Sequence, residues 1–297
     1  MNKPIKPVIK IIEQGGDSIL TQFLSLCIAA TMLVPVIGDA AENHYMGMEE
    51  DTVLEEHIPI EEFDEHMKED REKNTTEKKE IDYTIALREL GYYKEDHASK
   101  DINMRNAVLR FQSEHNLVVD GSFGPRSTKA LQERLQDKEF RHSDVITNTP
   151  TDKHWIAINK TKRILTLYYG NEVIKKYPIA QGKHPSATPE GKFTIVNKLV
   201  NPAWGGAGIS APVAGGSPQN PLGYRWMGIS HKGGGSYGIH GNNSPTSIGT
   251  NVSLGCVRMI NSDVEELYEL VNTKTPVWIG TDEKLKQWGV HNKSYAY

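Results

Sequence analysis

The chain has 297 residues, of which 37% are hydrophobic and 24% are charged, and its formal net charge is −4. This length allows about two domains at roughly 150 residues each, and the composition is typical of a folded protein with some solvated chain. The small charge, without a basic stripe or a zinc-finger spacing, argues against nucleic acid as a partner. The 11 histidines show no ligand spacing and no HExxH motif occurs, so no metal site is predicted.

The N-terminal segment has the pattern of an export signal. Lysines occur within residues 1–18, and residues 19–37 form an uncharged apolar run. The run is longer than the roughly 7–15 apolar residues of a cleaved signal and close to the roughly 20 of a spanning helix. Small residues near Ala40 would permit cleavage there. We therefore expect residues 1–41 to be a signal peptide or a membrane anchor, with possible membrane anchoring through residues 19–37.

Residues 42–80 are strongly acidic. They hold 15 acidic and 5 basic side chains, which gives this segment a net charge of −10. Such a segment, poor in aromatic residues, is typical of a solvated, self-repelling linker. The rest of the chain, residues 81–297, is mildly basic, which suits an acidic polymer as partner.

Residues 81–137 predict three short helices. The stretch "IDYTIALRELGYY" indicates the first, and "DINMRNAVLRFQSEHN" indicates a second with Met104, Val108 and Phe111 on one face. An Asp-Gly turn then precedes Pro125, which is typical of a helix start. We expect a small three-helix bundle.

The stretches "LRELGYY", "AVLRFQSEHNL" and "DGSFGPRSTKALQ" resemble the peptidoglycan-binding domain type 1. The resemblance covers most of residues 81–137 and implies attachment to the bacterial cell wall. The alternative is a helical spacer that binds nothing.

Residues 153–280 read as a mostly β domain. The stretches "HWIAIN", "ILTLYY", "EVIKKYPIA" and "GKFTIVNK" are rich in strand-forming residues and are separated by turn signals. Residues 201–223 hold four Pro and six Gly and predict a long loop, which in a compact domain is usually functional. The expected fold is multidomain, with the three-helix bundle followed by a sandwich-like β domain. Residues 281–297 are expected to form a final helix or a tail.

Cys256 is a candidate nucleophile. The other cysteine, Cys27, lies in the apolar N-terminal run, so no disulfide is expected. A thiol attacks carbonyls as thiolate, and His240 is a base that could take its proton. The loop-forming stretch "GNNSPTSIGT" between them would suit two strands that bring the pair together. Arg258 would share a face with Cys256 on a straight strand. The alternative is a small buried hydrophobic cysteine.

The stretch "IHGNNSPTSIGTNVSLGCVRM" resembles the L,D-transpeptidase catalytic domain, the YkuD family. The matching residues are His240, Gly241, Ser253, Gly255, Cys256 and Arg258, and the upstream "ATPEGKF" also fits. The resemblance implies that Cys256 is acylated and that His240 moves protons, oriented by the carbonyl of Gly241. It implies that Ser253, Gly255 and Arg258 shape the site and that no cofactor is needed. Many members carry a second histidine where this chain has Leu254.

The implied reaction joins stem peptides of peptidoglycan by 3→3 cross-links, with release of D-Ala, through a cysteine thioester. The partner is then peptidoglycan, and the location is the cell wall or the extracytoplasmic face of the membrane. Three alternatives stay open. Water could be the acceptor, as in an L,D-carboxypeptidase, or a protein lysine could be, or the chain could be a wall-binding protein without activity.

Overall fold

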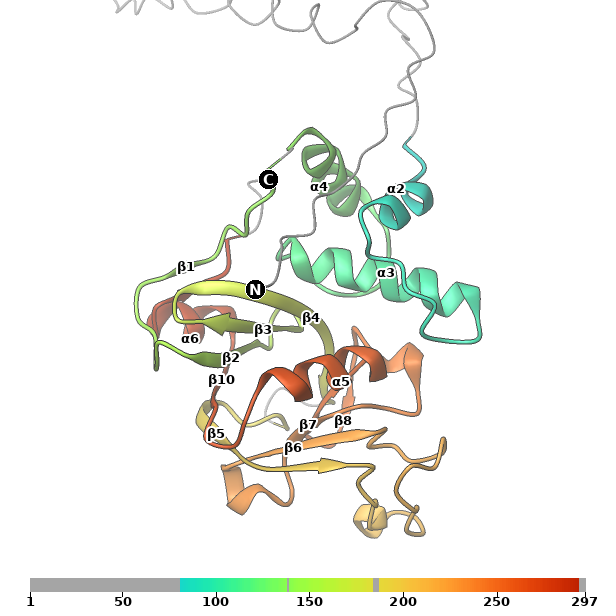
Figure 1. Cartoon of the computed structure of the whole chain (residues 1–297), viewed down its shortest axis with the longest axis vertical. Coiled ribbons are helices and arrows are strands. Elements are labelled where there is room, and N and C mark those ends of the chain that lie inside the picture. The colour runs from blue at the N-terminus through green and yellow to red at the C-terminus, as the bar shows by residue number, and fades with distance from the viewer. Residues whose placement is uncertain (1–80, 138, 184–186, 294–297) are drawn as a thin grey trace, which may run out of the picture. The chain divides into compact units, whose positions relative to one another are not determined.

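A computed structural model describes residues 81–137, 139–183 and 187–293 (Figure 1). The predicted signal or anchor and the predicted acidic linker lie outside these residues. Within the described ranges, no helix combines the length and apolar character needed to cross a membrane.

The helical part contains α2 (Tyr83–Glu89), α3 (Lys100–Glu114) and α4 (Pro125–Gln136). Their starts follow from local chemistry. Asp82 and Ser99 cap α2 and α3 by accepting a hydrogen bond from a backbone N–H of the first turn, and Pro125 occupies the first turn of α4. The helices and the segment after α3 share one buried cluster, formed by Ala86, Leu87, Ala107, Val108, Phe111, Leu117, Ala130 and Leu131.

The second part is mostly β, as predicted. Its strands are β1 (Val145–Ile146), β2 (His154–Asn159), β3 (Ile164–Tyr169), β4 (Glu172–Gly182), β5 (Gly191–Val200), β6 (Arg225–Ile229), β7 (Gly238–His240), β8 (Asn251–Ser253), β9 (Val257–Met259), β10 (Pro276–Gly280) and β11 (Val290–His291). The main sheet has the order β3-β2-β10-β5-β6-β7-β9-β4-β8. The strands "HWIAIN" and "ILTLYY" are β2 and β3 with the predicted bounds.

The sandwich-like packing expected from the sequence is replaced by a closed sheet. β3 pairs with both β2 and β4, so the strand order returns to its start. The closure depends on β4, which is 11 residues long. Its first part, up to Pro178, pairs with β3, and its last part, from Ile179, pairs with β9 and β8. Because β4 lies near the far end of the strand order and also pairs with β3 at its start, the sheet closes into a barrel instead of forming two facing layers.

A helix absent from the sequence prediction, α5 (Asn261–Leu270), follows β9 directly. It contributes Val264 and Leu267 to the core of the barrel, which also contains Ile156, Leu165, Ile179, Met227, Ile239 and Val257. The C-terminal segment, left open as helix or tail, forms α6 (Asp282–Gln287) and β11, and β11 pairs with β1. Residues 281–291 therefore belong to the packed structure.

Candidate active site

The two sequence-predicted catalytic residues lie on neighbouring parallel strands. His240 ends β7, and Cys256 immediately precedes β9, in which Arg258 is the register partner of His240. The three side chains line one cavity of about 760 Å³. The intervening segment 241–255 contains β8 and leads the chain from one strand to the next. The geometry thus brings together a thiol, an imidazole and a guanidinium, as the sequence predicts.

His240 is buried and held in one orientation. Its Nδ1 lies 2.7 Å from the carbonyl oxygen of Gly241. Because a carbonyl only accepts, Nδ1 carries the proton and Nε2 keeps its lone pair. The ring also stacks on Trp226, with centroids 5.7 Å apart.

The environment of His240 keeps its ring neutral. Burial lowers the pKa of His240 to about 4, hydrogen bonds with the backbone of Gly241 and Leu222 oppose this, and the charge of Arg258 adds to it. The imidazole is therefore a neutral base at pH 7.

Cys256 is partly exposed, and its thiol lies 3.6 Å from the carbonyl oxygen of Ser236, which accepts its weak hydrogen bond. Burial raises the pKa of Cys256, whereas a backbone hydrogen bond with Gly238 and the charge of Arg258 oppose the rise. The cavity thus holds a neutral thiol and a neutral imidazole. Such a pair can act by general base catalysis, with the proton moving during attack.

A short turn holds the backbone at Cys256. The Ser253 hydroxyl donates to the carbonyl of Cys256 at 2.6 Å and accepts from the N–H of Gly255 at 3.0 Å. Gly255 has φ +140°, and a Cβ there would lie 2.5 Å from the carbonyl oxygen of Ala187 and 2.6 Å from the ring of Tyr237. Only glycine fits this position, which explains why it precedes the cysteine.

Two asparagines not singled out in the sequence fix the segment after His240. The Asn261 side chain accepts from the N–H of Asn242 and donates to its carbonyl, both at 2.9 Å. Asn242 in turn donates to the carbonyl of Met259 at 2.6 Å. A Cβ at Gly241 would lie 2.3 Å from Asn261 Oδ1, so this close approach requires glycine. Nothing in a single sequence distinguishes these asparagines from ordinary turn residues.

Arg258 is the one Lys or Arg side chain among the described residues that line the cavity, and no Asp or Glu lines it. Its Nε is buried without a hydrogen-bond partner in the described part of the chain. Burial lowers the pKa of Arg258, and Cys256 opposes this shift. A guanidinium without an acidic partner suits a substrate carboxylate.

The remaining cavity wall is largely apolar and comes mainly from the long loop after β5. It is formed by Leu199, Pro202, Trp204, Ile209, Pro221, Leu222, Trp226, Val252 and Leu254. Two tryptophans, Trp204 and Trp226, line the cavity, whereas the nearby Tyr224 does not. Leu254 is 70% exposed. His231 lies outside the lining and packs edge-on against the rings of Phe193 and Tyr237.

Comparisons with known proteins match the β domain that contains this cavity. The model of the YkuD family, the L,D-transpeptidase catalytic domain, matches residues 153–279. YqjB of Bacillus subtilis is 40% identical over 132 residues, covering 44% of this chain and 73% of that protein. YkuD of Bacillus licheniformis is 42% identical over 134 residues, covering 45% of this chain and 70% of that protein. Both names assign these relatives to the L,D-transpeptidases.

Among solved structures, an L,D-transpeptidase from Xylanimonas cellulosilytica is 20% identical with a TM-score of 0.46, covering 67% of this chain and 91% of that one. The identities to the two Bacillus proteins, each matched over more than two thirds of its length, carry the assignment. The chain belongs to the L,D-transpeptidase (YkuD) family.

Proposed function

We propose that this chain is a peptidoglycan L,D-transpeptidase that forms 3→3 cross-links through a thioester on Cys256. The observation that carries the proposal is the shared cavity, in which a neutral His240 oriented by Gly241 lies with Cys256 and with Arg258, whose Nε has no hydrogen-bond partner among the described residues. Family membership supports it, because L,D-transpeptidases act on peptidoglycan.

In the first half-reaction, Cys256 Sγ attacks the L-centre carbonyl of the third residue of a stem tetrapeptide. The thiol proton passes to Nε2 of His240, the base left free by the Gly241 hydrogen bond. The peptide bond to the terminal D-Ala breaks, and the leaving amine takes the proton from the imidazolium. Free D-Ala and a thioester on Cys256 result.

In the second half-reaction, the side-chain amine of another stem peptide attacks the thioester carbonyl. His240 removes a proton from this amine and returns one to the Cys256 sulfur as the C–S bond breaks. The product is an amide between two third residues. The exchanged peptide bond supplies the energy, so neither ATP nor a cofactor is needed.

The cavity suits an anionic donor peptide. The guanidinium of Arg258 would pair with a carboxylate of the stem, and the apolar wall would pack against its aliphatic side chains. Among the residues that the structure describes, no acidic side chain lines the cavity to hold an ammonium group. The acceptor amine would therefore enter in its neutral, nucleophilic form.

Residues 81–137 would hold the enzyme to the cell wall, and the chain would be exported, with catalysis outside the membrane. Attachment to the polymer raises the local concentration of stem peptides near Cys256. Sedimentation of the full chain carrying Cys256→Ala with insoluble peptidoglycan tests this attachment, because turnover cannot release the protein. A chain that stays in the supernatant would contradict wall binding.

Product analysis tests the reaction itself. The chain and its Cys256→Ala variant are incubated with purified disaccharide-tetrapeptide, and products are weighed by mass spectrometry. A dimer that has lost one D-Ala, absent with the variant, is expected. Tripeptide alone would indicate a carboxypeptidase, and no product would favour a non-catalytic wall-binding protein.

A further inference from the structure

Helix α3, from the part of the chain that resembles a wall-binding domain, contacts the segment between the two catalytic residues. Arg105 Nη2 donates to the carbonyl of Ile248 at 2.8 Å, across 143 positions of sequence. Leu109 packs on the next residue, because a Cβ at Gly249 would lie 2.8 Å from Leu109 Cδ2. Gly249 itself donates its N–H to the carbonyl of Ile179 in β4 at 3.0 Å. The segment is thus held between α3 and the barrel.

The apolar packing extends to the chain after the nucleophile. One buried cluster unites Leu109 and Val119 of the helical part with Ile164, Ala180, Ile248 and Ile260 of the barrel. Ile248 precedes Cys256 in the chain, and Ile260 follows it between β9 and α5. Residues of the helical part therefore complete the core beneath both segments that flank the thiol.

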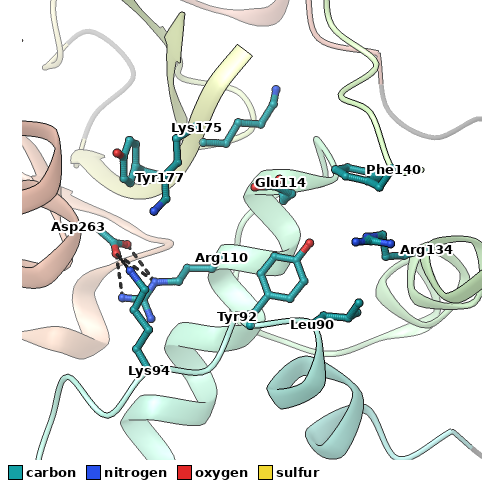
Figure 2. A pocket seen from close by; sticks show the side chains of 12 residues that line it. Leu90, Tyr92, Lys94, Arg110, Glu114, Arg134, Phe140, Lys175, Tyr177 and Asp263 are labelled. Carbon is teal, nitrogen blue, oxygen red and sulfur yellow. Dashed lines mark hydrogen bonds and ion pairs between the residues drawn. The ribbon is translucent and has the colours of Figure 1, made fainter. Parts of the chain in front are cut away.

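A buried ionic contact fixes the start of α5. Figure 2 shows Arg110 reaching from α3 to Asp263 beside a small cavity of about 240 Å³. Arg110 Nε and Nη2 donate to Asp263 at 3.1 and 2.9 Å, and Nη2 also donates to Ser262 at 3.1 Å and to Asp96. Arg110 is 7% exposed and Asp263 is 1% exposed.

This contact lies close in sequence to Asn261, which holds the backbone of the segment that follows His240. Asp263 is two residues after Asn261, whose side chain fixes the backbone of Asn242 beside His240 and Gly241. A displacement of the start of α5 would move Asn261 with it. The helical part therefore contacts the segment between the catalytic residues and, at Ser262 and Asp263, the first turn of the helix that carries Asn261.

We propose that α3 positions the active site and that Arg105 is a positioning residue for the segment between His240 and Cys256. The helical part then serves catalysis in addition to any attachment to the wall. No residue of α3 lines the catalytic cavity, so its effect falls on the geometry of the catalytic pair and not on substrate contacts. The turnover readout rests on the proposed function, whereas the backbone readout does not.

The test uses the full chain with Arg105→Ala, Arg105→Lys and the control Lys100→Ala. Lys100 is exposed on the same helix, so its loss removes a charge without touching the barrel. A misplacement of about 1 Å can lower a rate by about 10². We expect Arg105→Ala to lower kcat by about tenfold to a hundredfold with an unchanged KM. The lysine variant keeps a donor and should recover part of the rate.

Amide hydrogen exchange of residues 241–256 gives the second readout. We expect faster exchange of this segment in Arg105→Ala than in the wild type or in Lys100→Ala, with the strands of the barrel unchanged. If residues 241–256 of Arg105→Ala exchanged at the wild-type rate, the inference would be overturned, whatever the turnover. A lowered Tm with unchanged kcat and unchanged exchange would overturn it as well. If the wild type formed no cross-link but Arg105→Ala still exchanged faster, only the proposed function would be refuted.

Discussion

Replacement of Ser253 by alanine tests whether one hydroxyl holds Cys256, the proposed nucleophile, in place. Its oxygen lies 2.6 Å from the carbonyl oxygen of Cys256 and 3.0 Å from the nitrogen of Gly255, and Ser253 is 3% exposed. The variant leaves one buried N–H and one C=O without this partner. Each such group costs about 1–3 kcal/mol, so we expect the free energy of unfolding to fall by about 2–6 kcal/mol. The loosened turn should also lower kcat by about tenfold or more.

The assay is urea unfolding at pH 7, followed by tryptophan fluorescence, together with the rate of cross-link formation. Ser122→Ala is the control, because Ser122 is exposed in the helical part. Exposed substitutions of this kind stay within about 0.5 kcal/mol. If Ser253→Ala unfolded and turned over like Ser122→Ala, the hydroxyl would not hold the turn and the reasoning would be refuted.

Three further predictions follow from the same geometry. Gly255→Ala forces φ +140° on an alanine and places its Cβ against Ala187 and Tyr237. The variant should lose about 1–3 kcal/mol of stability and most of its activity. A melting temperature and a turnover equal to those of the wild type would contradict this. Burial raises the pKa of Cys256 and lowers that of His240 to about 4, so the thiolate forms only as the pH rises. Alkylation of Cys256 by iodoacetamide should therefore become faster from about pH 6 to pH 9. A plateau of reactivity near about pH 5–6 would instead indicate a preformed thiolate–imidazolium pair. Arg110→Met leaves the buried Asp263 without its main partner. The free energy of unfolding, measured by urea titration, should fall by about 3–5 kcal/mol. A loss below about 1 kcal/mol would show that the contact is not needed.

The neighbouring strands next to His240 and Cys256 and much of the strand content could be predicted because their signals are local. The stretch "HWIAIN" is apolar and bounded by turn signals, so β2 has the predicted bounds. The spacing from His240 to Cys256, with loop-forming residues between, predicts two neighbouring strands, and the structure pairs β7 with β9. The Gly241 carbonyl implied by the family resemblance lies at hydrogen-bonding distance from His240.

Features that depend on distant partners could not be predicted. The closure of the barrel requires β4 to pair with β3 on one side and with β9 on the other, and no local pattern in β4 specifies two partners. Asn261 holds the backbone of Asn242, which lies 19 positions earlier in the chain, and Arg110 contacts Asp263 across 153 positions. Their residue types suit many surface sites, so their roles emerge only once the chain is folded. Helix α5 begins two residues after the last residue of β9, within the stretch for which the sequence predicts a mostly β domain.

The most direct test of the proposed chemistry is to trap the acyl-enzyme. The full chain is incubated with a stem tetrapeptide, quenched in acid, digested and mapped by mass spectrometry. We expect a tripeptide adduct on the fragment that carries Cys256. Hydroxylamine should release it, as it does any thioester, and the adduct should be absent from Cys256→Ala. An adduct on another residue, or cross-linking that persists in Cys256→Ala, would contradict it.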